Sequence, residues 1–222
     1  MAKGKSDATK VLDDLQVKLR PALKERGFRV RGRAFNRVTS DGLTEVVQLQ
    51  AGRFDPPGTT YFPGLRENLY GKFTVNLGVF VPEVAELYEW PTKSFVQEHY
   101  CCIRTRLSFL GQTRRDVWWN VRADEVLIEE LMQRLVQDAI PFFRKFETRD
   151  AILGQWLAVP QSPDGIGIVP PRIICAIILA RRGRSQDARV LLAAQVRETL
   201  NPGHPAFVRR LSDKLGLGEL GS

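Results

Sequence analysis

Residues 71–81, GKFTVNLGVFV, alternate between apolar side chains and polar or small ones. Every second residue from Phe73 to Val81 is apolar, and Asn76 and Gly78 stand between them. Strict alternation of this kind is typical of a β-strand that packs one face against a core. The segment therefore predicts a sheet with one buried apolar face and one polar face. The rest of the chain must show what the polar face is for.

Four further segments have the composition of strands. They are residues 33–39, 44–51, 101–109 and 117–121. Ser40, Asp41 and Gly42 form turns readily and lie between the first two segments, so an antiparallel meander is predicted. Residues 53–70 are rich in proline and glycine and are predicted to be a surface loop of the kind that often carries binding contacts.

Helical periodicity appears on both sides of these strands. Near the N-terminus, leucines recur at helical spacing at positions 12, 15, 19 and 23. Gly27 is placed to end this helix, and Pro21 inside it predicts a kink or two abutting helices. Asp124 and Thr148 are placed to begin two later helices. The predicted fold class is α+β, an antiparallel sheet of about five strands with these helices on its apolar face.

The C-terminal part of the chain is predicted to be helical throughout. Three units follow from the composition: an α+β domain at residues 1–158, a Pro/Gly-rich linker at 159–171, and a C-terminal helical appendage at 172–222. Residues 178–192 resemble one helical hairpin of the tetratricopeptide kind. Because one hairpin does not make a free-standing array, we expect it to pack on the main body.

Charge is unevenly distributed along the chain, which carries a net +8 over 222 residues. Residues 1–37 hold 11 Lys/Arg against 4 Asp/Glu, residues 38–171 hold 13 against 17, and residues 172–222 hold 9 against 4. Two basic ends thus flank a mildly acidic middle. Any attraction to polyanions is expected at the ends of the chain rather than over the body.

The cysteines predict a reducing, cytoplasmic compartment. Cys101, Cys102 and Cys175 have the spacing of neither a disulfide framework nor a zinc site. The first ten residues lack the apolar core of a signal peptide, and the apolar run at residues 173–180 is far shorter than a membrane span. We expect no membrane association, and no cofactor or metal is indicated.

The polar face gathers six side chains if the strands pair in one sheet. They are Gln48, Gln50, Thr74, Asn76, Arg104 and Arg106. Arginine offers a rigid bidentate fork to a carboxylate or phosphate, and amides can donate beside it. Trp118 and Trp119 must point to opposite sides of a strand, and an exposed Trp118 would add a recognition anchor. The alternative is an ordinary solvated sheet face, which is the norm for antiparallel sheets.

The order of these segments carries a family resemblance. The motifs are a basic segment at residues 27–37, VVQLQ at 46–50, FTVNLGVFVP at 73–82, CCIRTRLSFL at 101–110 and VWW at 117–119. Over about residues 10–150 the chain resembles the bacterial family called domain of unknown function 4304. The family name implies no assigned activity. The resemblance does imply that the polar positions at Gln48, Asn76, Arg104 and Arg106 recur in the family.

These observations favour a non-enzymatic bacterial binding protein. Its polar sheet face would hold a small anionic ligand or the acidic segment of a protein partner. Arg104 and Arg106 would supply charge, while Gln48 and Asn76 would supply orientation. One version of this hypothesis is an immunity or defence-associated protein, whose partner would be a toxin with an acidic surface.

A nucleic-acid-binding protein is the first rival hypothesis. The basic segment interleaves four arginines with apolar residues, as a strand that tracks phosphates would: Arg29, Arg31, Arg33 and Arg37. Alternating arginines on an edge strand also prevent edge-to-edge association, which is the structural alternative.

An undetected cysteine-dependent enzyme is the second rival. Cys102 is expected on the polar side with Arg104 two residues further on, and a neighbouring guanidinium lowers the pKa of a thiol. A base would also be required, and His99 and His204 are the two histidines of the chain. A free cysteine in a strand is more often a small buried apolar residue.

Overall fold

The computed structural model describes residues 7–52, 69–91, 94–111, 114–158 and 169–220. Most of the loop predicted at residues 53–70 and of the linker predicted at 159–171 lies outside the described residues.

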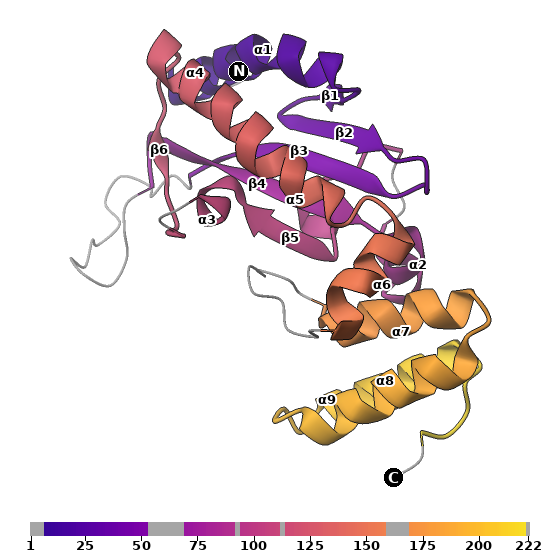
Figure 1. Ribbon diagram of the computed structural model, residues 1–222. Coiled ribbons are helices and arrows are strands. Elements are labelled where there is room, and N and C mark those ends of the chain that lie inside the picture. Colours follow the sequence, from indigo (N-terminus) through magenta and orange to yellow (C-terminus); the bar gives the residue numbers. More distant parts are fainter. Residues whose placement is uncertain (1–6, 53–68, 92–93, 112–113, 159–168, 221–222) are drawn as a thin grey trace.

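Among the described residues, six strands form one antiparallel sheet (Figure 1). They are β1 (Arg29–Arg31), β2 (Ala34–Val38), β3 (Thr44–Ala51), β4 (Lys72–Phe80), β5 (Ile103–Arg106) and β6 (Trp119–Asn120). The strand order is β1-β2-β3-β4-β5, and β6 also pairs with β4. The alternating segment quoted at the outset forms β4, which pairs with β3 on one side and with β5 and β6 on the other. The predicted α+β fold is confirmed.

Two predicted strands are shorter than expected. The segment at residues 101–109 contributes β5 alone, because the chain turns at once into the helix α3 (Leu107–Leu110). The segment at 117–121 contributes only the two residues of β6. Both differences have one cause: β5 and β6 share the same edge of β4, so neither can pair along its whole length. The hairpin from β1 to β2 was not predicted; it turns at Gly32, whose φ of 57° suits glycine.

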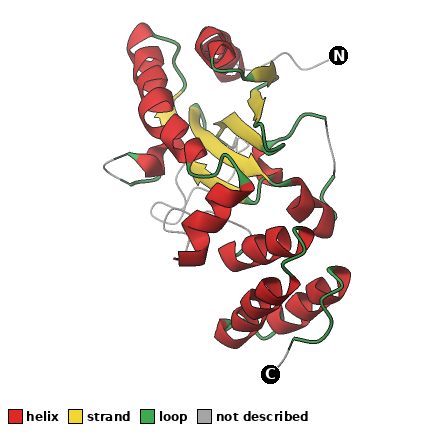
Figure 2. Ribbon diagram, turned by 45° about the vertical axis from the view of Figure 1, so that its right-hand side comes forward, coloured by secondary structure: helices red, strands yellow, loops and turns green. Residues whose placement is uncertain are grey.

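Helices cover the apolar face of the sheet, as predicted (Figures 1 and 2). They are α1 (Asp7–Glu25), α4 (Glu125–Arg134) and α5 (Ile140–Arg144), the last two joined by a π-helical turn at Leu135–Ala139. α1 runs as one helix through Pro21 rather than as two abutting helices. Leu19 and Leu23, on either side of the proline, are both buried in the same core, which holds both halves of the helix against the body of the protein. Gly27, at a φ of 83°, follows the helix end, as predicted.

The C-terminal helices pack on the body of the protein through one continuous core. They are α6 (Arg149–Ala158), α7 (Pro171–Arg181), α8 (Ser185–Glu198) and α9 (His204–Lys214). Every side chain from Ile173 to Leu179 in α7 is buried, because this helix lies between α8 and the elements α6 and α2 (Pro82–Leu87) (Figure 1). The predicted hairpin of α7 and α8 is present, with Gly183 at a φ of 76° in the turn.

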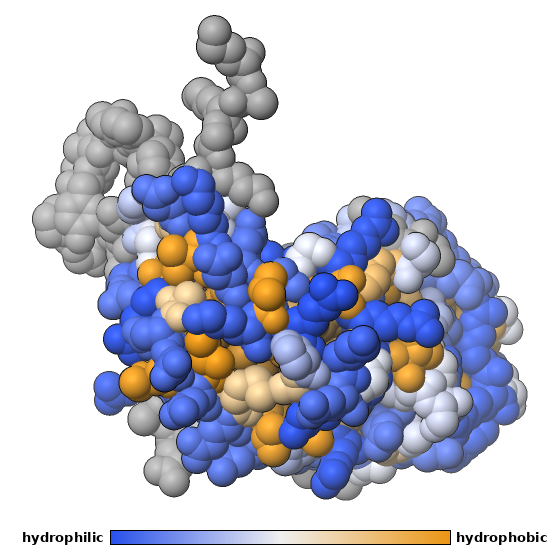
Figure 3. Space-filling view, turned by 90° about the horizontal axis from the view of Figure 1, so that it is seen from above, coloured by the Kyte–Doolittle hydropathy of each residue, from blue (hydrophilic) through white to orange (hydrophobic). Residues whose placement is uncertain are grey.

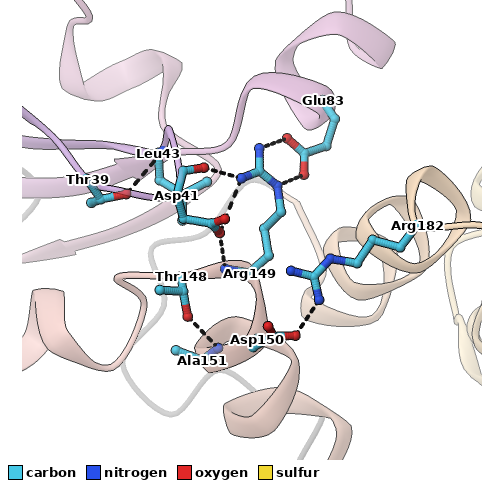
Figure 4. Close-up of polar contacts among 9 residues, drawn as sticks. All are labelled: Thr39, Asp41, Leu43, Glu83, Thr148, Arg149, Asp150, Ala151 and Arg182. Atoms are coloured by element: carbon cyan, nitrogen blue, oxygen red, sulfur yellow. Dashed lines mark hydrogen bonds and ion pairs between the residues drawn. The ribbon is translucent and has the colours of Figure 1, made fainter.

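A half-buried arginine, Arg149, joins the sheet to the helical part (Figure 4). The Arg149 guanidinium donates to both carboxylate oxygens of Glu83 on α2, at 2.6 and 2.8 Å. It also donates to the backbone oxygen of Asp41 in the β2–β3 turn, and the Arg149 backbone N–H donates to the Asp41 carboxylate at 2.6 Å. The hydrogen bonds with Glu83 raise the pKa of Arg149. This junction fixes the turn, α2 and α6 relative to one another.

Ion pairs between oppositely charged parts of the chain surround this junction. The basic partners come from the C-terminal segment and the acidic ones from the middle: Arg181 with Glu86, Arg182 with Asp150, and Lys214 with Glu89. Part of the positive charge of the C-terminal segment therefore lies against the acidic middle. In this region, the basic C-terminal segment and the acidic middle of the chain neutralise each other.

Candidate functional site

The strand register brings the predicted polar residues onto one face of the sheet. Gln48 lies opposite Asn76, and Asn76 lies opposite Arg106, so these three form one row across β3, β4 and β5. Arg104 lies in the next row, opposite Gly78. The side chains predicted to share a face do so, but they do not share one environment.

One half of the polar face is closed by residues 94–101, which we call the covering segment. It includes the 3₁₀ helix η1 (Glu98–Tyr100), which packs on β3 and β4. Asn36 of β2 anchors its beginning: the Asn36 amide donates to the Val96 backbone oxygen at 2.9 Å and accepts from the Val96 N–H at 2.6 Å. Asn36 is 7% exposed. Both backbone groups of Val96 are thus satisfied by one side chain of the sheet.

Glu98 of the covering segment forms hydrogen bonds with two of the residues that were predicted to bind a ligand. Its carboxylate accepts from Arg104 Nε at 2.5 Å and from Arg104 Nη2 at 3.0 Å. Its backbone N–H donates to Gln48 Oε1 at 2.8 Å. The Arg104 and Glu98 side chains are 17% and 7% exposed. Arg104 and Gln48 therefore hold a segment of the same chain.

Gly78 on β4 permits the closest approach of the covering segment. A Cβ at this position would lie 2.6 Å from Cys101 Cβ and 2.7 Å from its sulfur, which is far inside van der Waals contact. A small apolar cluster surrounds this contact: Val46, Phe80, Ala85, Val96 and Cys101. The closed half is a second, minor core on the side of the sheet that the alternation predicted to be polar.

Among the described residues, the other half of the polar face, around Arg106, is covered less completely. The Arg106 guanidinium pairs with the Asp116 carboxylate and lies over the Trp118 ring, with Cζ 5.2 Å from the ring centroid. The Arg106 side chain is 20% exposed and that of Asp116 is 45% exposed. Asn76 is buried and donates to Gln50 Oε1, and Gln50 itself is exposed. We call Gln50, Asn76, Arg106, Asp116 and Trp118 the open site.

The two adjacent tryptophans lie on opposite sides, as predicted. Trp119 is 8% exposed, stacks on Phe73 with ring centroids 5.8 Å apart, and donates from Nε1 to Glu130 at 3.0 Å. Trp118 is half-buried and belongs to the polar side, where its ring contacts Arg106 rather than Arg104.

The prediction that Cys102 lies on the polar side is wrong. Cys102 is buried in the main core, where its sulfur lies 3.7 Å from the Val79 oxygen, and it is Cys101 that lies on the polar side. The two positions are exchanged because β5 begins at Ile103, so alternation does not extend back through the cysteines. Burial raises the pKa of Cys102 to about 12, which keeps the thiol protonated and disfavours the role of a nucleophile.

The basic segment is divided between internal and exposed arginines. Arg33 pairs with Asp13 of α1 at 2.9 Å, and Arg37 pairs with Glu45 at 2.6 Å while its Cζ lies 4.8 Å from the Phe28 ring centroid. These two arginines stabilise the fold. Arg29 and Arg31 are exposed on β1.

Other kinds of site find little support in the described part of the chain. No three His, Cys, Asp or Glu side chains there lie close enough together to hold a metal ion. Within the same residues, no helix combines the length and the apolar character needed to cross a bilayer. A hollow of about 430 Å³ lies beside α9, lined by Arg209, Asp213, Gly218, Glu219 and Leu220. Its mixed charges indicate no particular ligand.

Sequence reasoning missed three residues of the polar face. The side chain of Asn36 on β2 points to the same side of the sheet as that of Gln48 on β3. Strand alternation could therefore have assigned Asn36 to the polar face. Glu98 and Asp116 lie outside any regular strand, and their pairing with arginines of β5 has no signal in the local sequence.

Comparison with known proteins identifies one family. The sequence model of a family described as Domain of unknown function (DUF4304) matches residues 64–145, less than half of the chain. The resemblance predicted from the motifs is confirmed over this part, which includes Asn76, Arg104 and Arg106 but not Gln48. No curated protein and no solved structure matches the chain significantly.

Proposed function

We propose that this protein is a non-enzymatic binding protein that holds an acidic segment of a partner protein at the open site. One observation carries the proposal. A side-chain carboxylate, that of Asp116, already lies on a guanidinium stacked against an indole ring, at a position where the carboxylate is 45% exposed. The internal pair supports a carboxylate as the group that the Arg106 guanidinium binds.

Asp116 can be displaced at low cost. Exposed ion pairs contribute only about 0–1 kcal/mol, so a carboxylate from a partner can replace Asp116 without unfolding anything. The pair of Arg104 with Glu98 differs, since separating a buried pair costs about 3–5 kcal/mol. The proposed binding site is therefore limited to the half of the polar face that contains Arg106.

The neighbouring side chains add selectivity to the charge. Trp118 holds the guanidinium plane by a cation–π contact, which favours bidentate recognition of a planar carboxylate. The Asn76 amide donates a hydrogen bond to the Gln50 side-chain oxygen, and no described residue accepts one from the Gln50 amide nitrogen. That amide is placed to donate to a second oxygen of the bound segment.

The biological setting of this activity is part of the proposal. We place the protein in the bacterial cytoplasm, where its three free, buried cysteines would remain reduced. An immunity or defence-associated role, with a toxin of acidic surface as the partner, fits a basic chain of this kind.

Binding of a fluorescently labelled oligoglutamate peptide, followed by fluorescence anisotropy, tests the proposal. Arg106→Gln and Trp118→Leu are each expected to weaken binding at least tenfold. Asp116→Asn is expected to strengthen it by about fivefold, because it removes an internal competitor worth up to about 1 kcal/mol.

Arg122→Gln is the matched control, since Arg122 is also paired with a nearby exposed carboxylate, that of Asp124 at 3.2 Å. The Arg122→Gln variant should bind the peptide with the same affinity as the wild type. Equal weakening by Arg106→Gln and Arg122→Gln would show that only net charge matters and would overturn the proposal. Competition by inorganic phosphate stronger than by the peptide would redirect it to a small anion.

A further inference from the structure

The polar face of the sheet repeats one pair of side chains, a glutamine of β3 and an arginine of β5. The first pair is Gln48 with Arg104, and the second is Gln50 with Arg106. β3 and β5 run in the same direction, because both are antiparallel to β4. A shift of two residues, about 6.7 Å, keeps each side chain on the same face. The second pair is therefore the first pair moved by one row along the sheet.

The first pair shows what such a pair binds. Gln48 Oε1 accepts from the backbone N–H of Glu98 at 2.8 Å. Arg104 donates to the carboxylate of the same residue, from Nε at 2.5 Å and from Nη2 at 3.0 Å. The pair thus holds a single acidic residue by its main chain and its side chain together. A carboxylate without a main chain would satisfy only the arginine.

In the second pair, the corresponding nitrogen atoms are available. Asp116 accepts from Arg106 Nη1, and no described residue accepts from Arg106 Nε or Nη2, which are the two nitrogens that Arg104 uses for Glu98. Neither nitrogen is among the fully buried polar atoms that lack a partner, so both reach the surface. Gln50 is exposed. A carboxylate of a partner can therefore bind this edge of Arg106 before Asp116 leaves Nη1.

Two differences between the pairs explain why the first holds its segment permanently. The same shift of one row carries the anchoring residue Asn36 onto Ala34, which offers no amide to a main chain. It also carries Gly78 onto Asn76, which has a side chain where Gly78 leaves room for Cys101. A segment bound by the second pair must therefore lie further from the sheet, and it is free to dissociate.

We infer, on the basis of the proposed function, that the open site recognises one glutamate residue of the partner together with its main chain. The carboxylate of this glutamate binds the Nε–Nη2 edge of Arg106. Because Asn76 already donates to Gln50 Oε1, the main chain is held through the Gln50 amide nitrogen, which donates to a backbone oxygen of the partner.

The length of the side chain favours glutamate over aspartate. Glu98 shows that a glutamate side chain spans the distance from its main chain, held by the glutamine, to the arginine of a pair. An aspartate side chain is shorter by one carbon–carbon bond, about 1.5 Å, so it cannot make both contacts with good geometry. The partner is therefore a glutamate-containing peptide segment rather than any polyanion.

Labelled oligoglutamate and oligoaspartate of equal length test this recognition, because they carry the same charge. In fluorescence anisotropy, the wild-type protein is expected to bind oligoglutamate at least about fivefold more tightly than oligoaspartate. Gln50→Leu is expected to weaken oligoglutamate binding and to reduce the preference to less than about twofold, because Arg106 then responds to charge alone.

Gln137→Leu is the matched control, and it should keep the preference of the wild type. Gln137 is exposed, and its Oε1 accepts from Gln133 as Gln50 Oε1 accepts from Asn76. It belongs to the π-helical turn that follows α4, on the other side of the sheet. Figure 3 views the end of the molecule at which α1 and α4 lie, where hydrophilic side chains are interspersed with apolar ones.

Equal affinity of the wild type for the two peptides, or a preference that survives Gln50→Leu, would overturn the inference. The proposed function would still stand in that case, provided that oligoglutamate binding depends on Arg106. Loss of that dependence would overturn both. Thermal unfolding checks that the variants fold.

A second variant decides the question if Gln50→Leu does not fold. Gln50→Glu keeps an acceptor for Asn76 and removes only the donor. Its preference for oligoglutamate should also fall below about twofold, while the charge-matched variant Gln137→Glu should keep the preference of the wild type. An unchanged preference in Gln50→Glu would overturn the inference.

Discussion

The two halves of the polar face contain the same motif and use it differently. Each has an arginine of β5 paired with a carboxylate from a following or preceding segment, Glu98 in one half and Asp116 in the other. The arginines are almost equally exposed, at 17% and 20%, but the carboxylates are 7% and 45% exposed. The accessibility of the partner therefore separates a structural ion pair from a binding residue. Strand alternation treats the two arginines as equivalent.

The largest effect is expected from Glu98→Ala. This change leaves the Arg104 guanidinium without its carboxylate in a site that remains largely closed, and losing one partner of a buried pair costs about 3–5 kcal/mol. The free energy of unfolding from urea denaturation measures it. Asp116→Ala is the matched change in the open half and should cost less than about 1 kcal/mol. Similar losses in the two variants would remove the distinction between the halves.

A smaller effect is expected from Gly78→Ala, which tests how tightly the covering segment lies on β4. The added methyl group would meet the Cys101 side chain, and overpacking of this kind costs about 1–3 kcal/mol. Adding Cys101→Gly removes the obstruction, so the double variant should be less destabilised than the sum of the two single variants. Strict additivity in urea denaturation would show that the two positions do not touch.

The smallest effect on stability is expected from Arg106→Gln. Because its ion pair is partly exposed, the free energy of unfolding should fall by less than about 1 kcal/mol, although the same change is expected to weaken peptide binding. Parallel urea denaturation and anisotropy measurements on one preparation separate the two effects. A large loss of stability would assign Arg106 to the fold, like Arg104.

Much of the fold was predictable because its signals are local. The alternation along residues 71–81 gave the central strand, and Gly27 marked the end of the first helix. Of the two outcomes predicted at Pro21, two abutting helices is wrong, since packing of leucines on both sides of the proline outweighs one lost hydrogen bond and α1 continues as one helix. The strand predicted at residues 101–109 was too long, because a competing segment, β6, takes the remaining edge of β4.

The site was predictable only in part. Alternation correctly placed Gln48, Asn76 and Arg106 on one face, but it could not show that Gln48 accepts from the backbone of Glu98, 50 residues away. It also assumed that the cysteines continue the strand, which exchanged the sides of Cys101 and Cys102. Such errors arise where the chain leaves regular structure, because period-two reasoning has no meaning there.

The sequence by itself determined which side chains face the same way, since strand and helix periods are properties of neighbouring residues. It also determined where charge is concentrated along the chain. Only the tertiary structure decided which of those charges are available. A guanidinium is neutralised by whichever carboxylate lies within about 4 Å, and that carboxylate can come from any part of the chain. Glu98 closes one half of the face, Asp116 leaves the other accessible, and no described carboxylate reaches Arg29 or Arg31.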